Sequence, residues 1–392
     1  MSLNSSIYNW QFFLLCLSSF LFFSSFNMII PELPSYLESL GGGDYKGLII
    51  SLFTLTAGLS RPFSGKLADR WGRIPVMIFG AVICFICGFL YPLASGVFLF
   101  LLLRFFHGLS TGFKPTGTSA YVADVVPATR RGEAMGILGL SGSLGMASGP
   151  AIGSYIAAAF SMDMMFYASS AAAILSILIL AGMKETLANS ESFRLSHLKL
   201  KKGEIFEPRV LAPSIVLMLT AFSFGIVLTV TPDFSDYLGI VNRGLFFTFF
   251  TVASVSVRFF AGKASDRYGR TAVLKVSTVM LTIGMLMLGM AESVTMFLAA
   301  SVVFGLASGM NTPTIFAWTI DLSHEQHRGR GMATMYIALE AGIGLGALSS
   351  GWIYANNNAN FIYTYGLGAI LALFAFIYLQ FKPKKQTLST AG

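Results

Sequence analysis

Charged side chains interrupt some of the most apolar parts of the sequence. Arg104, His107 and Lys114 lie within the apolar run 97–123, and Glu340 lies near the centre of a later apolar run. An ionisable group is costly in an apolar environment, so residues that keep one there are candidates for binding or proton transfer. The chemistry open to them is the recognition of a polar or charged solute and the reversible binding of a proton.

A polar stripe follows the run 97–123, because its polar residues recur every three or four positions and share one helix face. Such a face should contact protein or water rather than lipid. Arg104 and Lys114 are expected to reach a substrate cavity, although each could bond only to neighbouring protein groups. His107 could carry a proton or fill a hydrogen-bonded packing role. The expected cavity residues are Arg104, Thr111, Lys114, Asn311, Tyr336 and Asn27.

Carboxylates in the apolar runs are candidates for proton coupling. Glu340 has Tyr336 one helical turn earlier on the same face. A carboxyl group in that position could bind and release a proton, form a salt bridge with Lys114, or be purely structural. Glu32, near the end of the first apolar run, is a second choice. The expected proton-coupling residues are Glu340, Glu32 and His107.

The candidate residues need elements that hold them in an apolar solvent. Of the 392 residues, 55% are hydrophobic and 11% are charged, and the mean hydropathy is +0.71. A soluble domain is about one quarter charged, so the composition excludes a soluble globule and indicates a protein surrounded by lipid. A membrane helix needs about 20 apolar residues. About twelve runs fit that length: 9–30, 45–66, 74–94, 97–123, 132–158, 163–183, 211–238, 243–263, 271–291, 294–321, 329–354 and 359–381.

The predicted fold is an all-α membrane protein with twelve transmembrane helices, arranged as two pseudo-symmetric six-helix bundles around a central cavity. Residues 1–183 form the first bundle, 184–209 a polar cytoplasmic linker, and 210–392 the second bundle. The halves repeat, because Arg61–Arg73 matches Arg258–Arg270 at a constant offset. The same offset aligns Gly108 with Gly305, Gly112 with Gly309, Asp124 with Asp321, Gly145 with Gly342, and Ser143 with Glu340.

Basic residues cluster in alternate gaps between the apolar runs. The positive-inside rule then places these gaps and both termini in the cytoplasm, in a plasma (bacterial inner) membrane. Lys46 and Arg243 are exceptions at helix edges on the other side, where Asp233 and Asp236 are expected to be wetted rim groups. No cleavable signal peptide is evident, since the first run lacks a basic leader.

The three cysteines, Cys16, Cys84 and Cys87, all lie inside apolar runs. Cys84 and Cys87 form a C-x-x-C, but no second pair or histidine cluster accompanies them. Apolar packing is therefore the expected role, and neither a metal nor a cofactor is predicted.

One loop resembles a family signature. Gly65-Lys-Leu-Ala-Asp-Arg-Trp-Gly-Arg73 is similar to the G-x-L-a-D-r-x-G-r motif of the major facilitator superfamily, and Gly262–Arg270 resembles its second-half copy. Arg104–Gly108 is similar to the family's R-x-x-x-G motif. Pro31 and Pro34 resemble the proline pair of the twelve-helix drug/proton antiporter branch. The stretch at Gly145, Gly149, Pro150 and Gly153 resembles the G-x-x-x-G-P-x-x-G motif of antiporter members, with Ser154 where a further glycine is common.

The resemblance implies that the loop motif forms a gate at the cytoplasmic rim. Arg73 is expected to pair with Asp124, and Asp69 to face the positive N-terminus of the helix predicted at 329–354. The alternative is charge that only sets topology. The glycine–proline motif could form a moving contact between the halves or a static packing of small residues. The expected gating residues are Gly65, Asp69, Arg70, Gly72, Arg73, Asp124, Gly262, Asp266, Arg267, Arg270 and Asp321.

The leading functional hypothesis is a proton-coupled antiporter that exports a small amphipathic organic solute by alternating access. A symporter or uniporter of a sugar, organic anion or siderophore-like compound remains open, because two deep cations suit an anionic group. A membrane-embedded enzyme or receptor is a remote alternative, since no catalytic motif is present. The expected partners are the substrate, protons and the lipid bilayer. We expect the protein to be a monomer. We expect no binding of nucleic acid, because most of the cations lie at membrane edges.

Overall fold

The computed structural model describes residues 9–126, 131–187, 190–199, 207–323 and 328–381. Long helices dominate, as expected from runs of apolar residues whose backbone groups cannot bond to lipid. The helices are α1 (Trp10–Ile29), α2 (Leu33–Ser39), α3 (Lys46–Arg70), α4 (Arg73–Leu90), α5 (Val97–Val125), α6 (Arg131–Ala159), α7 (Met162–Ala181), α8 (Leu211–Tyr237), α9 (Leu245–Tyr268), α10 (Arg270–Gly289), α11 (Val294–Leu322), α12 (Arg328–Tyr354) and α13 (Phe361–Gln380).

These thirteen helices of the described chain form twelve long segments, because a 3₁₀ turn at Ile30–Glu32 joins α1 to the short α2. The segments match the predicted apolar runs in order and position. Ten are long and apolar enough to cross a membrane, and α9, bent between Arg258 and Phe260, is an eleventh. The remaining one, α3, has 25 residues but is more polar. It packs between α5 and α12, so its polar groups face protein.

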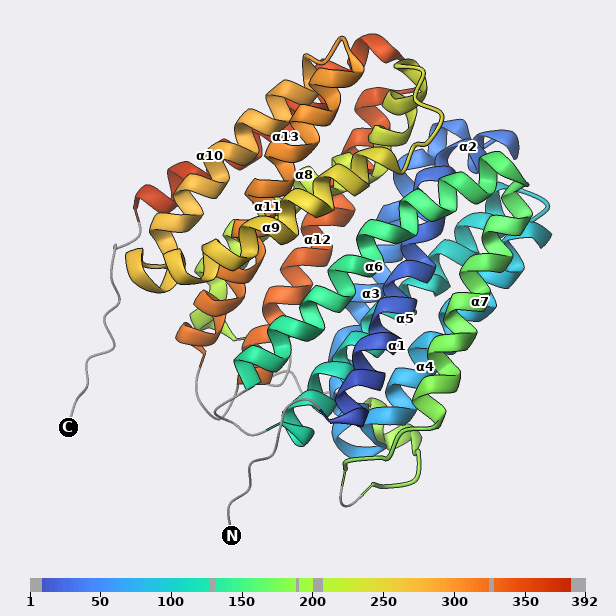
Figure 1. Cartoon of the computed structure of the whole chain (residues 1–392), viewed down its shortest axis with the longest axis vertical. Helices are drawn as coiled ribbons and strands as arrows, with labels where there is room; N and C mark the ends of the chain where they lie inside the picture. Colours follow the sequence, from blue (N-terminus) through green and yellow to red (C-terminus); the bar gives the residue numbers. More distant parts are fainter. Residues whose placement is uncertain (1–8, 127–130, 188–189, 200–206, 324–327, 382–392) are drawn as a thin grey trace.

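The packing of α1–α7 is repeated in α8–α13. In the first half α1 packs on α6, α3 on α5, and α4 on α7; in the second half α8 packs on α12, α9 on α11, and α10 on α13. Figure 1 shows the blue-to-green half beside the yellow-to-red half. The all-helical membrane fold with two related halves is therefore confirmed.

Glycines repeated in the sequence explain one of these helix pairs. A Cβ atom at Gly108 of α5 would lie 2.0 Å from the Phe53 carbonyl oxygen of α3. At the repeat-related position, a Cβ at Gly305 of α11 would lie 2.2 Å from the Phe250 oxygen of α9. Only a residue without a side chain permits so close a backbone approach. The two halves thus use the same contact.

The halves meet along two helix pairs, α3 with α12 and α6 with α9. The repeat relates these pairs to each other. Because the number of long segments is even, α1 begins and α13 ends at the same end of the bundle. We call this the inner end, and the opposite end, where α1 meets α2, the outer end (Figure 1).

Candidate functional site

Two adjoining cavities lie between the halves. The central cavity has a volume of about 390 Å³, and the inner cavity, lined mainly by the inner parts of α5, α6 and α11, about 580 Å³. Ser143, Arg258 and Tyr336 are among the residues that line both cavities. Of the residues predicted for the site, the central cavity is lined by Asn27, Arg104, Thr111, Asn311, Tyr336 and Glu340, and the inner cavity by Lys114 and Tyr336.

A buried ion pair joins the halves beside the central cavity. Arg61 of α3 donates a hydrogen bond from Nη2 to Oε1 of Glu340 of α12, at 2.9 Å. Both residues are buried, and the Arg61 guanidinium lies 4.1 Å from the centre of the Tyr336 ring. Glu340 therefore pairs with Arg61 and not with Lys114, which was one of the partners that the sequence left open. Arg61 itself was not predicted as a site residue.

The repeat counterpart of this pair lacks its acid. Arg258 of α9 corresponds to Arg61, and Ser143 of α6 corresponds to Glu340. The structure brings these two residues together as well: Arg258 donates from Nη1 to the Ser143 hydroxyl at 2.7 Å. Its Nε atom is buried without a hydrogen-bond partner among the described residues.

Lys114 of α5 has no ion-pair or hydrogen-bond partner for its ammonium within the part of the chain that is described. The residue is 1% exposed, and its Nζ atom lies 4.9 Å from the centre of the Phe22 ring. A cation above an aromatic face is attracted to it, but more weakly than to a carboxylate. The ammonium borders the inner cavity.

Arg104 is satisfied by protein groups. Its Nε atom donates to the Ile49 carbonyl oxygen at 2.9 Å and its Nη1 atom to the Tyr91 hydroxyl at 3.3 Å. The Tyr91 oxygen also lies 3.0 Å from His107 Nδ1, and His107 Nε2 lies 3.3 Å from the Cys84 sulfur. His107 is fully buried in this network inside the first half, and it is not among the described residues that line either cavity.

Two amides contribute to the central cavity. Asn311 accepts a hydrogen bond from Thr220 and donates one to Ser277, both at 3.1 Å. Asn27 donates to the Phe23 carbonyl oxygen at 2.7 Å. These bonds hold the amides in place on α11 and α1, with polar atoms beside the cavity.

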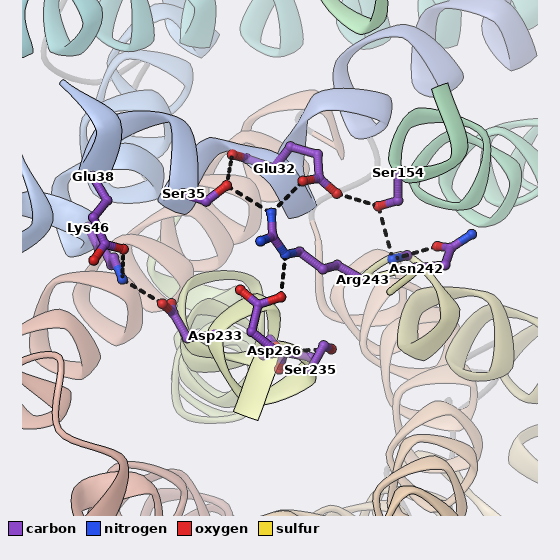
Figure 2. A network of polar contacts seen from close by, with 12 residues as sticks. Glu32, Ser35, Glu38, Lys46, Ser154, Asp233, Ser235, Asp236, Asn242 and Arg243 are labelled. Atoms are coloured by element: carbon purple, nitrogen blue, oxygen red, sulfur yellow. Dashed lines mark hydrogen bonds and ion pairs between the residues drawn. The ribbon is translucent and has the colours of Figure 1, made fainter. Parts of the chain in front are cut away.

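A polar network closes the outer end (Figure 2). Arg243, between α8 and α9, donates to Glu32 at 2.5 Å and to Asp236 at 2.6 Å, and so links the two halves. Glu32 accepts a second bond from Ser154 of α6 at 2.7 Å. Burial lowers the pKa of the Arg243 guanidinium, but the hydrogen bond to Asp236 and the charge of Glu32 raise it by more. The Arg243 guanidinium therefore remains charged.

A second cross-pair repeats this arrangement. Lys46, at the repeat position of Arg243, contacts Asp233 of α8 at 2.5 Å and Glu38 at 3.1 Å (Figure 2). Lys46 is 4% exposed. Each of these cations, near the start of the second long segment of one half, thus reaches an acid on the first long segment of the other half. The expectation that Asp233 is a wetted rim group was wrong, because it lies inside this closed contact.

Backbone contacts tighten the same end. A Cβ atom at Gly47 would lie 2.7 Å from the Ala347 oxygen, and one at Gly244 would lie 2.3 Å from the Pro150 oxygen. Gly47 with Ala347 and Gly244 with Pro150 are repeat counterparts. The outer end is therefore sealed symmetrically, while the larger cavity lies toward the inner end.

The glycines of the antiporter-like motif pack inside one half. Cβ atoms at Gly145, Gly149 and Gly153 would lie 2.5, 2.7 and 1.9 Å from carbonyl oxygens of α1. Of the motif's four principal residues, Pro150 is the one whose carbonyl meets the other half, at Gly244. Close packing against α1 is thus the observed contact of the three glycines.

The inner rim carries the loop motif in both halves. Arg73 bonds to Asp124 at 3.0 Å and to Asp69 at 2.8 Å. Its repeat counterpart Arg270 bonds to Asp321 at 2.9 Å and to Asp266 at 2.5 Å. The Arg73–Asp124 contact is the expected one. The side chains at the start of α12, which Asp69 was expected to face, lie outside the described residues.

Two glycines shape the turns between these helices. Gly72 has φ +136° and Gly269 has φ +90°, values that residues with a side chain rarely adopt.

The other motif residues make fewer contacts. Arg70 lies 3.9 Å from Glu191, and Arg267 lies over the Tyr268 ring. Added Cβ atoms at Gly65 and Gly262 would meet open space.

Residues that sequence reasoning missed had visible signals. Arg61 and Arg258 open the two copies of the repeated stretch. Lys46 and Arg243 were the exceptions to the charge pattern, and their shared repeat position marked them as a pair.

Comparison with known proteins agrees with this architecture. The sequence matches the profile of the Major Facilitator Superfamily over residues 15–242 and again over 214–391. It is 31% identical to multidrug resistance protein 2 of Bacillus subtilis over 58% of this chain and 58% of that protein. It is 27% identical to the multi-drug resistance efflux pump PmrA of Streptococcus pneumoniae over 76% of this chain and 78% of that protein.

Solved structures show the same fold. The D-xylose-proton symporter superimposes with a TM-score of 0.77 at 18% identity, covering 95% of this chain and 97% of that one. The family profile covers both repeated halves, which carry the paired rim motifs and enclose the cavities between them. The chain therefore belongs to the Major Facilitator Superfamily.

Proposed function

We propose that this transporter exports a small amphipathic organic solute in exchange for protons, by alternating access. The exchange runs across a plasma membrane, with both termini in the cytoplasm, and the working unit is a monomer. Residues 1–183 and 210–392 move as the two bundles, joined by the linker 184–209. The inner end then faces the cytoplasm, and a solute enters the cavities from there.

The observation that carries this proposal is the Arg61–Glu340 ion pair. It is buried, lies at the α3–α12 contact between the halves, and borders the central cavity. Removing one charge from a buried pair leaves the other uncompensated, which is strongly destabilising. Protonation of Glu340 therefore changes the stability of the α3–α12 contact, about which we propose that the halves move.

A transport cycle follows from this pair. In the first step of the proposed cycle, Glu340 releases its proton toward the inside and pairs with Arg61, and the cavities accept the solute. Opening of the outer end releases the solute, and a proton entering from outside neutralises Glu340. The protonated carrier returns, and the proton leaves to the cytoplasm.

The direction of transport is supported by sequence relatives. The names of two of them are multidrug resistance protein 2 and multi-drug resistance efflux pump. The alternatives are a symporter, in which solute and proton move in the same direction, and a uniporter, in which solute movement is not coupled to protons. The apolar lining, which includes Phe22, Phe23 and Phe316, suits the hydrocarbon part of an amphipathic solute.

Proteoliposomes with an imposed pH gradient and a clamped membrane potential test the proposal. The probes are 4-phenylbutanesulfonate and 4-phenylbutyltrimethylammonium, whose permanent charges keep them from carrying protons themselves. An antiporter accumulates a probe when the lumen is acidic. Accumulation of a probe with an alkaline lumen would establish symport instead. Uptake that does not depend on the pH gradient would establish a uniporter.

A further inference from the structure

Basic side chains outnumber acidic side chains in the described lining of the two cavities. Their described lining holds four basic side chains, Arg61, Arg104, Lys114 and Arg258, and one acidic side chain, Glu340. Glu340 forms an ion pair with Arg61, and Arg104 donates hydrogen bonds to Ile49 and Tyr91. Two cations are left without a counter-charge in the described lining, Lys114 and Arg258.

Lys114 and Arg258 border the same inner cavity from opposite halves. Lys114 is 1% exposed, and the side chain that its ammonium approaches is the Phe22 ring. Arg258 bonds to a neutral hydroxyl, that of Ser143, where its counterpart Arg61 bonds to a carboxylate. The repeat thus keeps the arginine in both halves but the acid in one.

We infer that Lys114 and Arg258 form a binding site for the anionic head of the transported solute. A compact carboxylate, phosphate or sulfonate accepts charge-assisted hydrogen bonds from an ammonium and a guanidinium at once. The hydrocarbon part packs on Phe22, Phe23, Met135 and Phe316, which line the same cavity. The transported solute is therefore an amphipathic organic anion.

The position of the two cations gives this site a role in transport. One belongs to α5 of the first half and the other to α9 of the second. An anion held by both neutralises charge that otherwise remains uncompensated between the halves. Neutralisation favours a state in which the halves close around the solute, since uncompensated buried charge is costly. For this transport step the inference rests on the proposed function, while binding itself does not.

Equilibrium binding to the purified full chain in lipid nanodiscs tests the site. Three probes share one skeleton: 4-phenylbutanesulfonate, 4-phenylbutanol and 4-phenylbutyltrimethylammonium. The expected dissociation constant of the sulfonate is at least about ten-fold lower than that of either other probe, as for one hydrogen bond to a charged group. Equal or tighter binding of the ammonium, or no binding of the sulfonate, would overturn the inference.

Variants locate the charge. Lys114→Gln and Arg258→Gln should each weaken sulfonate binding by about ten-fold to a hundred-fold and leave the alcohol unchanged. Lys114→Arg should restore most of the affinity, which separates loss of charge from loss of folding. Lys263→Gln, which changes an exposed cation on the same α9, is the matched control. Wild-type sulfonate affinity in both glutamine variants would contradict the assignment.

The two proposals fail separately. Tight, Lys114-dependent sulfonate binding without pH-driven accumulation would retain the anion site and refute proton antiport. Accumulation of the ammonium probe in an acidic lumen, with weak sulfonate binding, would retain antiport and refute the anion site.

Discussion

Arg61 on α3 and Glu340 on α12 lie 2.9 Å apart across the contact between the halves, and the repeat copy of this pair is Arg258 with Ser143. One half of the molecule therefore supplies a neutralised arginine, and the other an arginine that faces the cavity without an acid. This difference between two otherwise matched pairs underlies the two proposals, proton coupling at Arg61–Glu340 and anion recognition that includes Arg258.

The outer network predicts a shift in conformation when its charge is removed. Glu32→Gln loses the ionic contact with Arg243 and should shift the population toward an open outer end by about ten-fold, the effect of one charge-assisted bond. Spin labels at Asp44→Cys and Val241→Cys, both exposed, would report longer distances. The native cysteines are buried and should not react.

Glu38→Gln is the matched control for the outer network. Glu38 also contacts a cation, Lys46, but its side chain is 59% exposed. Exposed ion pairs contribute about 0–1 kcal/mol to stability. The spin-label distance distribution of Glu38→Gln should therefore stay near that of the wild type. Equal distributions for the wild type and Glu32→Gln would show that the network does not hold the outer end closed.

The sequence predicted the helices well because their cause is local. Lipid requires each span to be apolar and to satisfy its own backbone bonds, so runs such as 97–123 or 329–354 are visible one at a time. The repeat also aligned Gly108 with Gly305, and the structure shows that these glycines lie at the matching α3–α5 and α9–α11 contacts.

Partner choice could not be predicted in the same way. Arg104 and Lys114 share one helix face and looked alike in the sequence. Arg104 has hydrogen-bond partners in α3 and the turn after α4, whereas Lys114 faces an aromatic ring. Which acid meets which cation depends on the tertiary arrangement, and so the sequence offered Lys114, and not Arg61, as a possible partner of Glu340.

The inner rim predicts loss of transport without loss of stability. The Asp69 side chain is 73% exposed, so its pair with Arg73 adds at most about 1 kcal/mol to stability. Asp69→Asn should keep the unfolding temperature of the wild type. It should strongly reduce probe transport, because we expect the Asp69 charge to serve a contact in another conformation of the transport cycle. Asp44→Asn, an exposed change at the outer end, should keep both. Wild-type transport in Asp69→Asn would remove the gating role.

Helix packing predicts a stability difference within α6. A Cβ atom at Gly153 would clash with the Met28 carbonyl oxygen, so Gly153→Ala should destabilise the protein by about 1–3 kcal/mol. Gly139→Ala on the same helix meets open space and should be neutral or stabilising. Thermal unfolding in detergent compares the two. Similar melting temperatures for both variants would contradict the packing described here.

The orientation predicts a pattern of cysteine labelling. Asp44→Cys, Asp163→Cys and Asn357→Cys lie at the outer end and should react with a membrane-impermeant maleimide added to intact cells. Ser192→Cys, in the linker, should react only after the membrane is permeabilised, because basic segments stay in the cytoplasm. Labelling of Ser192→Cys in intact cells would reverse the assigned orientation.

The most direct test of proton coupling compares two glutamates in the proteoliposome assay. Glu340→Gln removes the charge at the α3–α12 ion pair, whereas Glu292→Gln changes an exposed carboxylate between α10 and α11. We expect Glu340→Gln to lose pH-driven accumulation of 4-phenylbutanesulfonate while it retains exchange of labelled for unlabelled probe, and Glu292→Gln to behave as the wild type. Wild-type accumulation by Glu340→Gln in an acidic lumen would contradict the assignment of Glu340 as the coupling group.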